Sequence, residues 1–271
     1  MADRWTSSQK FPVARVVVDD EGAPTGVLID AAKTLIDALI PEPTSAEIRA
    51  YLVEGMRSFN RAGFTHIRDM TCRTNQWNEA LHLDESGLLT LAVEIFFGTL
   101  EGADFQTVLK EAIAASKVRT KSLRIKGVKV FADGALGSEG TLLSRCNCSG
   151  SGHGLSLLTD DEIEQAMKLT WQAGLEIAVH VIGDEAAHRT ASAAAKLWNE
   201  GTRGRLHLEH AEMLRPETIA LLKQRDVICH MQPCHWHTDR LWLKEKLGEL
   251  YQYVFPRARF AGGANCLHLR Q

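Results

Sequence analysis

The polar side chains that close the strand-like segments are the residues of this 271-residue chain best suited to chemistry. The stretch "GLEIAVHVIGDEAAH", Gly174 to His188, begins with an apolar run suited to a buried strand, yet that run ends in His180. A core strand gains nothing from an imidazole at its exit unless a nitrogen ligand or a proton carrier is needed there. The same pattern recurs in five strand candidates, whose exit residues are Asp69, Lys129 with Asp133, His180, Glu209 with His210, and Gln232 with His235.

Imidazoles at the ends of neighbouring strands suit a divalent transition metal, and zinc fits best. Neutral nitrogen donors supply part of its shell and leave a place for water. A lone histidine at a strand end is more often a satisfied core or rim group, but five such strand ends weaken that interpretation. Lys129 has two interpretations: burial lowers its pKa so that CO2 adds and a carbamate ligates the metal, or it forms a salt bridge to Asp133 or another nearby acid.

The elements that must position these residues alternate along the chain. A helix beginning after Thr44, with Glu47 completing a capping box, opens the series. Strand candidates cover 65–70, 89–97, 123–133, 175–183, 205–211 and 226–233, and further helix candidates cover 104–117, 159–174, 184–200 and 216–224. This alternation predicts a parallel α/β sheet. A doubly wound sheet usually carries a glycine-rich first turn, which is missing, so we predict a (β/α)8 TIM barrel, whose strand ends meet at one mouth.

Composition narrows the class of partner. The net charge of -3 and the mixed placement of charges provide no basic surface, so a small-molecule substrate is expected, with neither nucleic acid nor membrane as a partner. The six cysteines are too scattered for a secreted disulfide scaffold and are expected to be reduced. Without a signal-like N-terminus or an apolar run of membrane-spanning length, the sequence predicts a cytoplasmic protein.

Several of these strings resemble those of a known family. "GAPTGVLID", "GVKVFADGALGS", "AVHVIGDEA", "LHLEHA" and "MQPCHWHTDRLW", in this order, are similar to the amidohydrolase superfamily, and within it to the amidohydrolase-3 branch of predicted metal-dependent TIM-barrel hydrolases, which includes exoenzyme regulatory proteins. The resemblance runs from roughly Val16 to Gly248. It implies hydrolysis of amide-type or imide-type C–N bonds by metal-activated water. Lys129, often carboxylated in such enzymes, His180 and His210 would be metal ligands. We also expect substrate or indirect supporting roles for a second set of residues: Asp133, Asp184, Glu209, Gln232 and His235.

The sequence also departs from the family pattern. The strand-one HxH pair and the strand-eight catalytic aspartate are not found: the one HxH, His235 to His237, follows strand seven, and after Gly263 the sequence reads "ANCLHLRQ". Strand one, most of strand eight and the small β domain are therefore expected to be missing. We expect an N-terminal segment, 1–43, and a partial barrel, 44–271, truncated at both ends.

An incomplete barrel leaves two other questions open. The chain could be a non-catalytic binding or regulatory barrel instead of an enzyme, and its open sheet edges favour a homo-oligomer. "PTGVLID" is interpreted as a turn before a helix or as a loop near the substrate entrance. The patches "CNCSGSGH" and Cys229 to His237 lack paired CxxC spacing, so we interpret their cysteines as free thiols and expect Cys229 and His230 to pack in a strand.

Overall fold

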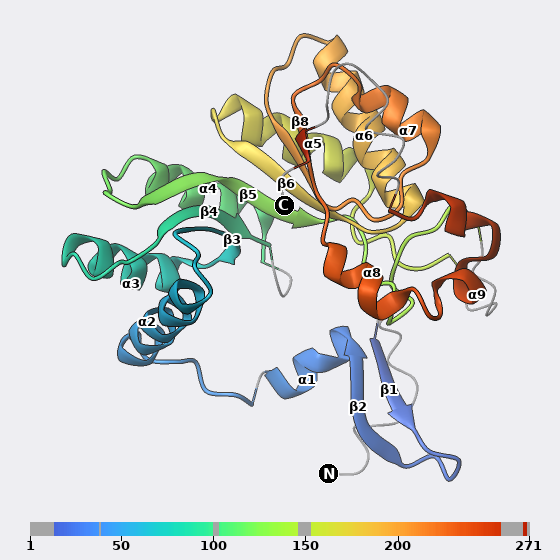
Figure 1. The fold of residues 1–271 in the computed structure, drawn as a ribbon, viewed down its shortest axis with the longest axis horizontal. Helices are drawn as coiled ribbons and strands as arrows, with labels where there is room; N and C mark the ends of the chain where they lie inside the picture. Colours follow the sequence, from blue (N-terminus) through green and yellow to red (C-terminus); the bar gives the residue numbers. More distant parts are fainter. Residues whose placement is uncertain (1–13, 38, 100–102, 146–152, 256–267, 270–271) are drawn as a thin grey trace.

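The computed structural model describes residues 14–37, 39–99, 103–145, 153–255 and 268–269. It consists of an antiparallel pair of strands and a larger parallel sheet with helices on its outer side (Figure 1). The elements in chain order are β1 Ala14–Val18, β2 Pro24–Asp30, η2 Ala31–Lys33, α1 Thr34–Asp37, α2 Ser45–Arg61, β3 His66–Cys72, α3 Thr74–Glu85, β4 Ala92–Gly98, α4 Phe105–Ser116, β5 Leu123–Phe131, α5 Asp160–Gln172, β6 Glu176–Val181, α6 Asp184–Asn199, β7 Leu206–His210, α7 Pro216–Leu222, β8 Val227–His230, α8 Pro233–Asp239, α9 Leu243–Leu247, η4 Gly248–Tyr253 and β9 His268–Leu269.

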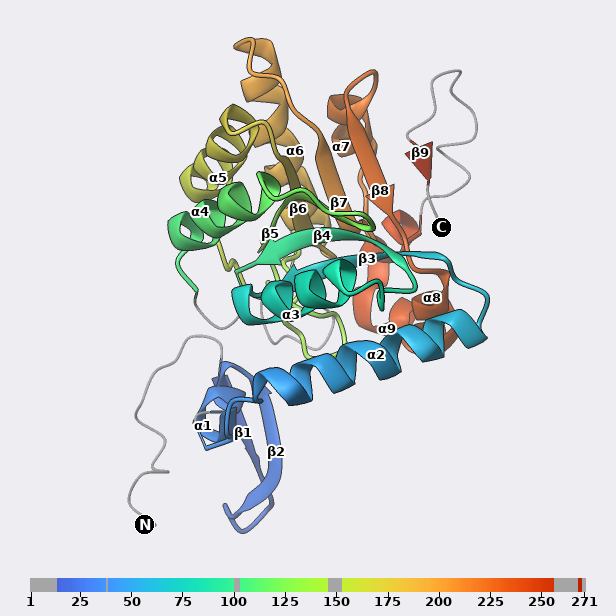
Figure 2. The ribbon, with the colours of Figure 1, turned by 90° about the vertical axis from the view of Figure 1, so that its left-hand side faces the viewer.

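The larger sheet has the strand order β3-β4-β5-β6-β7-β8-β9, and every neighbouring pair is parallel. The sheet is curled, with α3 to α7 outside it (Figures 1 and 2). Strands that follow one another in the sequence are also neighbours in the sheet, as in a (β/α)8 barrel, whereas a doubly wound sheet reverses its order at a switch point. The predicted α/β class and parallel sheet are confirmed, and the described strands form a curled half-barrel consistent with part of a TIM barrel.

The strands divide their side chains between two environments. Residues facing the helices are apolar and buried, for example Val128 and Val130 on β5 and Ile177 and Val179 on β6. The intervening positions include Lys129 on β5 and His180 on β6, because successive strand residues point to opposite faces. The inner face of the half-barrel is therefore where the polar residues are gathered.

The helices form where their end signals predict. Thr44 and Thr159 each cap a helix in a complete capping box, with Glu47 and Glu162 as the reciprocal partners. On α5 and α6, Trp171 and Trp198 stack with ring centroids 5.6 Å apart and are both buried, which agrees with their interpretation as inner-face core residues. Helix α3 was not predicted from the sequence, although it buries Trp77 and Leu83 against the sheet.

The N-terminal segment corrects two expectations. "PTGVLID" is neither a turn nor an entrance loop but strand β2, which pairs antiparallel with β1 in a two-stranded sheet. Its run of Val27, Leu28 and Ile29 is rich in β-branched residues, and β pairing outweighs the turn preference of Pro24 and Gly26. This segment contributes a strand pair below the parallel sheet (Figure 2).

The last described strand, β9, pairs parallel with β8. Since β8 corresponds to strand seven of the family barrel, β9 lies where strand eight would be. Cys72, Cys229 and Cys234 are free thiols, as expected, while Cys146, Cys148 and Cys266 lie outside the described residues. Within the described ranges, no helix is long and apolar enough to cross a membrane.

Candidate functional site

Lys129, His180 and His210 come from three adjacent parallel strands, β5, β6 and β7. Phe131 pairs with His180 and Val181 pairs with His210, so the strand ends are level. The rings of His180 and His210 lie with centroids 4.4 Å apart. The fold thus brings the two predicted histidine ligands together, and Lys129 is close enough to shift the pKa of both.

Burial disfavours the protonated, positively charged forms of all three side chains. Burial lowers the pKa of Lys129 to about 7, and Nζ of Lys129 lies 3.7 Å from the ring centroid of Phe131. Burial, reinforced by the nearby Lys129, lowers the pKa of His180 to about 2 and that of His210 to about 4. Both imidazoles are therefore neutral at pH 7 and can offer nitrogen lone pairs.

His210 is oriented by its neighbours at the end of β7. Its backbone has φ 71°, an uncommon left-handed conformation for a residue with a side chain. Its Nδ1 lies 2.6 Å from Oε1 of Gln232, so a proton on Nδ1 is donated to that amide oxygen and Nε2 is left as the acceptor. The ring of His235 stacks on His210 at a centroid distance of 5.6 Å. Gln232 and His235 thus lie beside the predicted ligand His210.

A buried carboxylate lies close to this group. Glu212 is 2% exposed, and its Oε1 has no hydrogen-bond partner among the residues that the structure describes. Its Oε2 lies 3.8 Å from Nδ1 of His235. Burial, together with Asp239 and Asp133, raises the pKa of Glu212 to about 7. Sequence reasoning missed this residue, although it follows the "LHLEHA" string directly.

Asp133 and Asp184 fix loops instead of pairing with Lys129. The carboxylate of Asp133 accepts backbone hydrogen bonds from Leu142, Ile182 and Gly183 at 2.8 to 3.1 Å, and its Oδ1 is 3.8 Å from Nε2 of His180. Within the described part of the chain, Lys129 has no ion pair, and its Nζ donates to the carbonyl of Val130 at 3.3 Å. The salt bridge to Asp133 that the sequence left open is therefore not formed.

Asp184 is buried at the first position of α6. It accepts hydrogen bonds from the backbone N–H of Ser144 at 3.1 Å and from its hydroxyl at 2.5 Å, and Nε of Arg215 lies 3.6 Å away. These contacts tie the loop after β5 to the start of α6. The structure gives Asp184 no contact with the predicted ligands His180 and His210.

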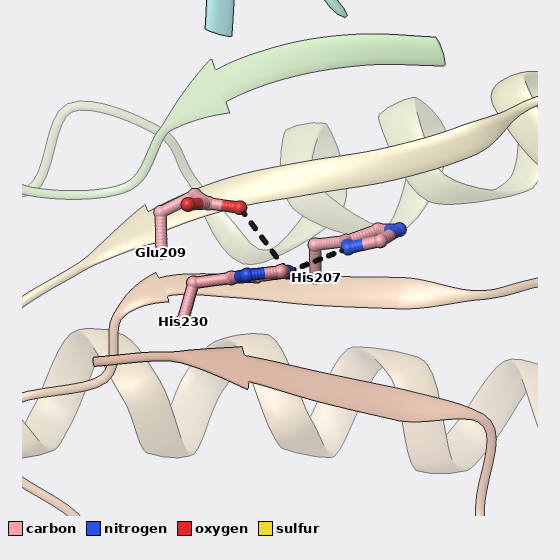
Figure 3. Close-up of side chains that lie close together, drawn as sticks. All are labelled: His207, Glu209 and His230. Carbon is pink, nitrogen blue, oxygen red and sulfur yellow. Dashed lines mark hydrogen bonds and ion pairs between the residues drawn. The ribbon is translucent and has the colours of Figure 1, made fainter. Parts of the chain in front are cut away.

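Glu209 belongs to a second cluster on the inner face of the sheet. His207 and Glu209 lie two residues apart on β7, and His230 ends β8 beside them (Figure 3). Ligand atoms of these three residues all lie within 4.8 Å of one another. Arg68, from β3, contacts Oε1 of Glu209 at 3.0 Å. The sequence did not single out Arg68 or His207, and His230 was expected to pack in a strand. The two-residue spacing of His207 and Glu209 could have indicated that both side chains lie on the same face of the sheet.

The family follows from comparison with known proteins. The model of the amidohydrolase family matches residues 1–256, nearly the whole sequence. The chain belongs to the amidohydrolase family. Its relatives include Protein LONG AFTER FAR-RED 3 of Arabidopsis thaliana, 26% identical over 84% of this chain and 41% of that protein, and the putative amidohydrolase YtcJ of Bacillus subtilis (strain 168), 25% identical over 86% and 44%.

Two solved structures share the fold of this amidohydrolase. Both are described as uncharacterized metal-dependent hydrolases, from Pyrococcus horikoshii and Pyrococcus furiosus, and both superpose with a TM-score of 0.70 at 22% and 23% identity. They cover 91% and 87% of this chain, which covers 48% of each of them. The chain thus spans less than half the length of these two curated relatives and two solved structures.

Proposed function

We propose that this chain carries part of the active site of a metal-dependent hydrolase that cleaves non-peptide C–N bonds of the amide or imide type in a small-molecule substrate. The observation that carries the proposal is the convergence of His180 and His210, both neutral, beside the buried Lys129. Membership of the amidohydrolase family and the metal-dependent hydrolases among its structural neighbours support a divalent metal.

The residues present fit such an ion. Zinc takes neutral imidazole nitrogens and carboxylate-type oxygens, and His180 and His210 provide the nitrogens. Lys129, with its pKa lowered to about 7, is uncharged in a large fraction of molecules at neutral pH, which is the form that adds CO2 to give a carbamate oxygen ligand. When bound, the ion would supply Lewis acidity that polarises the scissile carbonyl and activates water.

The chain's own residues contribute orientation and a proton site. Gln232, accepting from Nδ1 of His210, holds Nε2 toward the site, as outer partners of metal-binding histidines do. Glu212 combines burial, an oxygen that accepts no hydrogen bond from the described residues and a pKa of about 7, which are the properties of a carboxyl that exchanges a proton near neutral pH. We include it among the candidate proton carriers, in a family whose catalytic aspartate this sequence does not show.

The test is metal content followed by hydrolysis. The purified protein is supplied with zinc and bicarbonate and then dialysed. Its metal content is measured by inductively coupled plasma mass spectrometry, and its hydrolytic activity is tested on a panel of amides, cyclic imides and N-acyl amino acids. We expect the wild type to hold about one equivalent of zinc more than either His180→Ala or His210→Ala. A wild type that holds no more zinc than these variants would refute this metal site, and metal without hydrolysis of any panel member would favour a binding barrel.

Gln232→Leu separates ligation from orientation. Removing the acceptor for His210 Nδ1 should weaken zinc affinity about 10- to 100-fold without abolishing binding. Competition with a chromophoric chelator measures the change. The control is Gln252→Leu, because Gln252 is exposed in η4 and, within the described ranges, its amide hydrogen-bonds to the backbone of Glu249 alone. Equal affinities of the two variants would contradict the assigned orientation.

A further inference from the structure

The inner face of the sheet carries a second group of ligand-type side chains, separate from the three predicted metal ligands. His207, Glu209 and His230 point toward one another from β7 and β8 (Figure 3). Nδ1 of His207 and Nε2 of His230 are 2.9 Å apart, and Nε2 of His230 is 3.8 Å from Oε1 of Glu209. These separations bracket the about 3.3 Å between ligand atoms of a tetrahedral ion with bonds of about 2.0 Å.

The outer partners of His207 decide which nitrogen faces the cluster. Nε2 of His207 lies 2.6 Å from Oε2 of Glu176, and Oε1 of Glu176 is 2.7 Å from Nζ of Lys126. Burial opposes ionisation of Glu176, but hydrogen bonds from His207 and Lys126 hold its pKa down at about 2, so Glu176 is an acceptor. His207 therefore donates through Nε2 and directs its Nδ1 lone pair inward, the carboxylate–histidine arrangement typical of metal ligands.

Two donors now converge on that lone pair. Nε2 of His230 approaches Nδ1 of His207 at 2.9 Å, and Nη2 of Arg68 approaches it at 3.4 Å while also contacting Oε1 of Glu209 at 3.0 Å. In this cluster the lone pairs of His207 Nδ1 and Glu209 Oε1 thus face two hydrogen-bond donors, the His230 N–H and the Arg68 guanidinium. A divalent ion could take the place of both, if His230 moved its proton to its other nitrogen.

We propose that His207 Nδ1, Glu209 Oε1 and His230 Nε2 form a second binding site for a divalent transition metal of the zinc class, and that Arg68 and the metal are alternative occupants of this site. Two imidazoles and one carboxylate are a zinc-type ligand set that leaves a fourth position for water. The site takes one ion, and its carboxylate is the one anionic ligand.

Arg68 has room to withdraw. Its side chain is 22% exposed, and its strand, β3, is the outermost strand of the sheet, paired only with β4 among the described residues. A guanidinium and a divalent cation cannot both contact Glu209 Oε1 without strong repulsion, because the side chains around them are largely buried. Removal of the Arg68 charge should therefore strengthen metal binding, whereas a purely structural ion pair predicts no metal binding at all.

The experiment isolates this site from the one proposed above. The His180→Ala/His210→Ala variant of the 271-residue chain is stripped with a chelator and titrated with Co2+ and with Zn2+, using the visible absorption of Co2+ and isothermal calorimetry. We expect one equivalent to bind, with the strong visible bands of four-coordinate Co2+. Adding Arg68→Met should raise the affinity about tenfold, and adding His230→Gln or Glu209→Gln should lower it at least tenfold.

The matched control is His188→Gln on α6, where Nδ1 of His188 contacts only the hydroxyl of Thr218 among the described residues. This variant should bind Co2+ as tightly as the parent. Circular dichroism and thermal melting verify that each variant is folded. If His230→Gln does not fold, Glu209→Gln is used in its place. No Co2+ binding in the folded parent double variant would overturn the proposal, as would an affinity that Arg68→Met leaves unchanged or lowers. Either outcome leaves the hydrolase proposal intact, because His180 and His210 are already removed.

Discussion

Lys129→Met should make the metal-free protein more stable near neutral pH, although it removes a predicted ligand. Lys129 is 3% exposed, and burial is the main cause that lowers its pKa from 10.5 to about 7. In the unfolded chain the same lysine is protonated at pH 7. Folding must therefore either release this proton or bury the charge, and both cost free energy that methionine avoids.

The pH range of the effect follows from the two pKa values. The native state holds fewer protons than the unfolded state between pH 7 and 10.5, so wild-type stability rises with pH across this window. The gap between 10.5 and about 7 corresponds to a penalty of about 4 kcal/mol at pH 7, which declines to near zero above pH 10.5. Loss of the hydrogen bond from Lys129 to the Val130 carbonyl cancels about 1 kcal/mol of this gain. We therefore expect Lys129→Met to raise the free energy of unfolding by about 3 kcal/mol at pH 7.

Urea unfolding followed by tryptophan fluorescence measures the difference. Chelator-treated wild type and variant are compared at pH 7, 8.5 and 10.5 in degassed buffer, so that neither metal nor carbamate contributes. Lys168→Met, at an exposed position of α5, is the control and should show no such pH dependence. A Lys129→Met protein that is less stable than wild type at pH 7, or a difference that does not shrink with rising pH, would refute the reasoning.

Three further predictions concern the scaffold. Glu176→Gln removes a half-buried carboxylate whose pKa is lowered to about 2. The loss of wild-type stability as pH falls from about 5 to 2 should therefore be smaller in this variant, as measured by urea unfolding across that range. Gly183→Ala places a Cβ 1.9 Å from the carbonyl oxygen of Leu142 and should lower the free energy of unfolding, measured by calorimetry, by at least about 1–3 kcal/mol. The control is Gly137→Ala, whose added Cβ has nothing within 4 Å and should leave stability unchanged. Equal melting temperatures of the two variants would contradict the packing around Gly183. We also propose a homo-oligomer through the outer edge of β3, which light scattering should report as a dimer, and a monomer at all concentrations would contradict it.

Much of the fold could be read from local signals. The capping boxes at Thr44 and Thr159 and the alternation of apolar strands with amphipathic helices predict elements that the structure confirms, because these signals act within a few residues. Helix α3 escaped prediction since its N-cap, Arg73, is not a usual capping residue and its buried Asp84 masks the apolar face. Asp84 is explained by contacts far along the chain, as it accepts from the backbone N–H of Lys121 and Ser122.

By itself, the sequence determined the order of strands and helices, the amidohydrolase resemblance and the presence of Lys129, His180 and His210 at consecutive strand ends, because each depends on spacing along the chain. Only the tertiary structure decided how polar residues group on the inner face. His230 meets His207 because Glu209 pairs with His230 in the register of β7 and β8, and Arg68 reaches Glu209 across 141 positions of sequence. Strand register and sheet curvature set these contacts, and neither is written in any local stretch of residues.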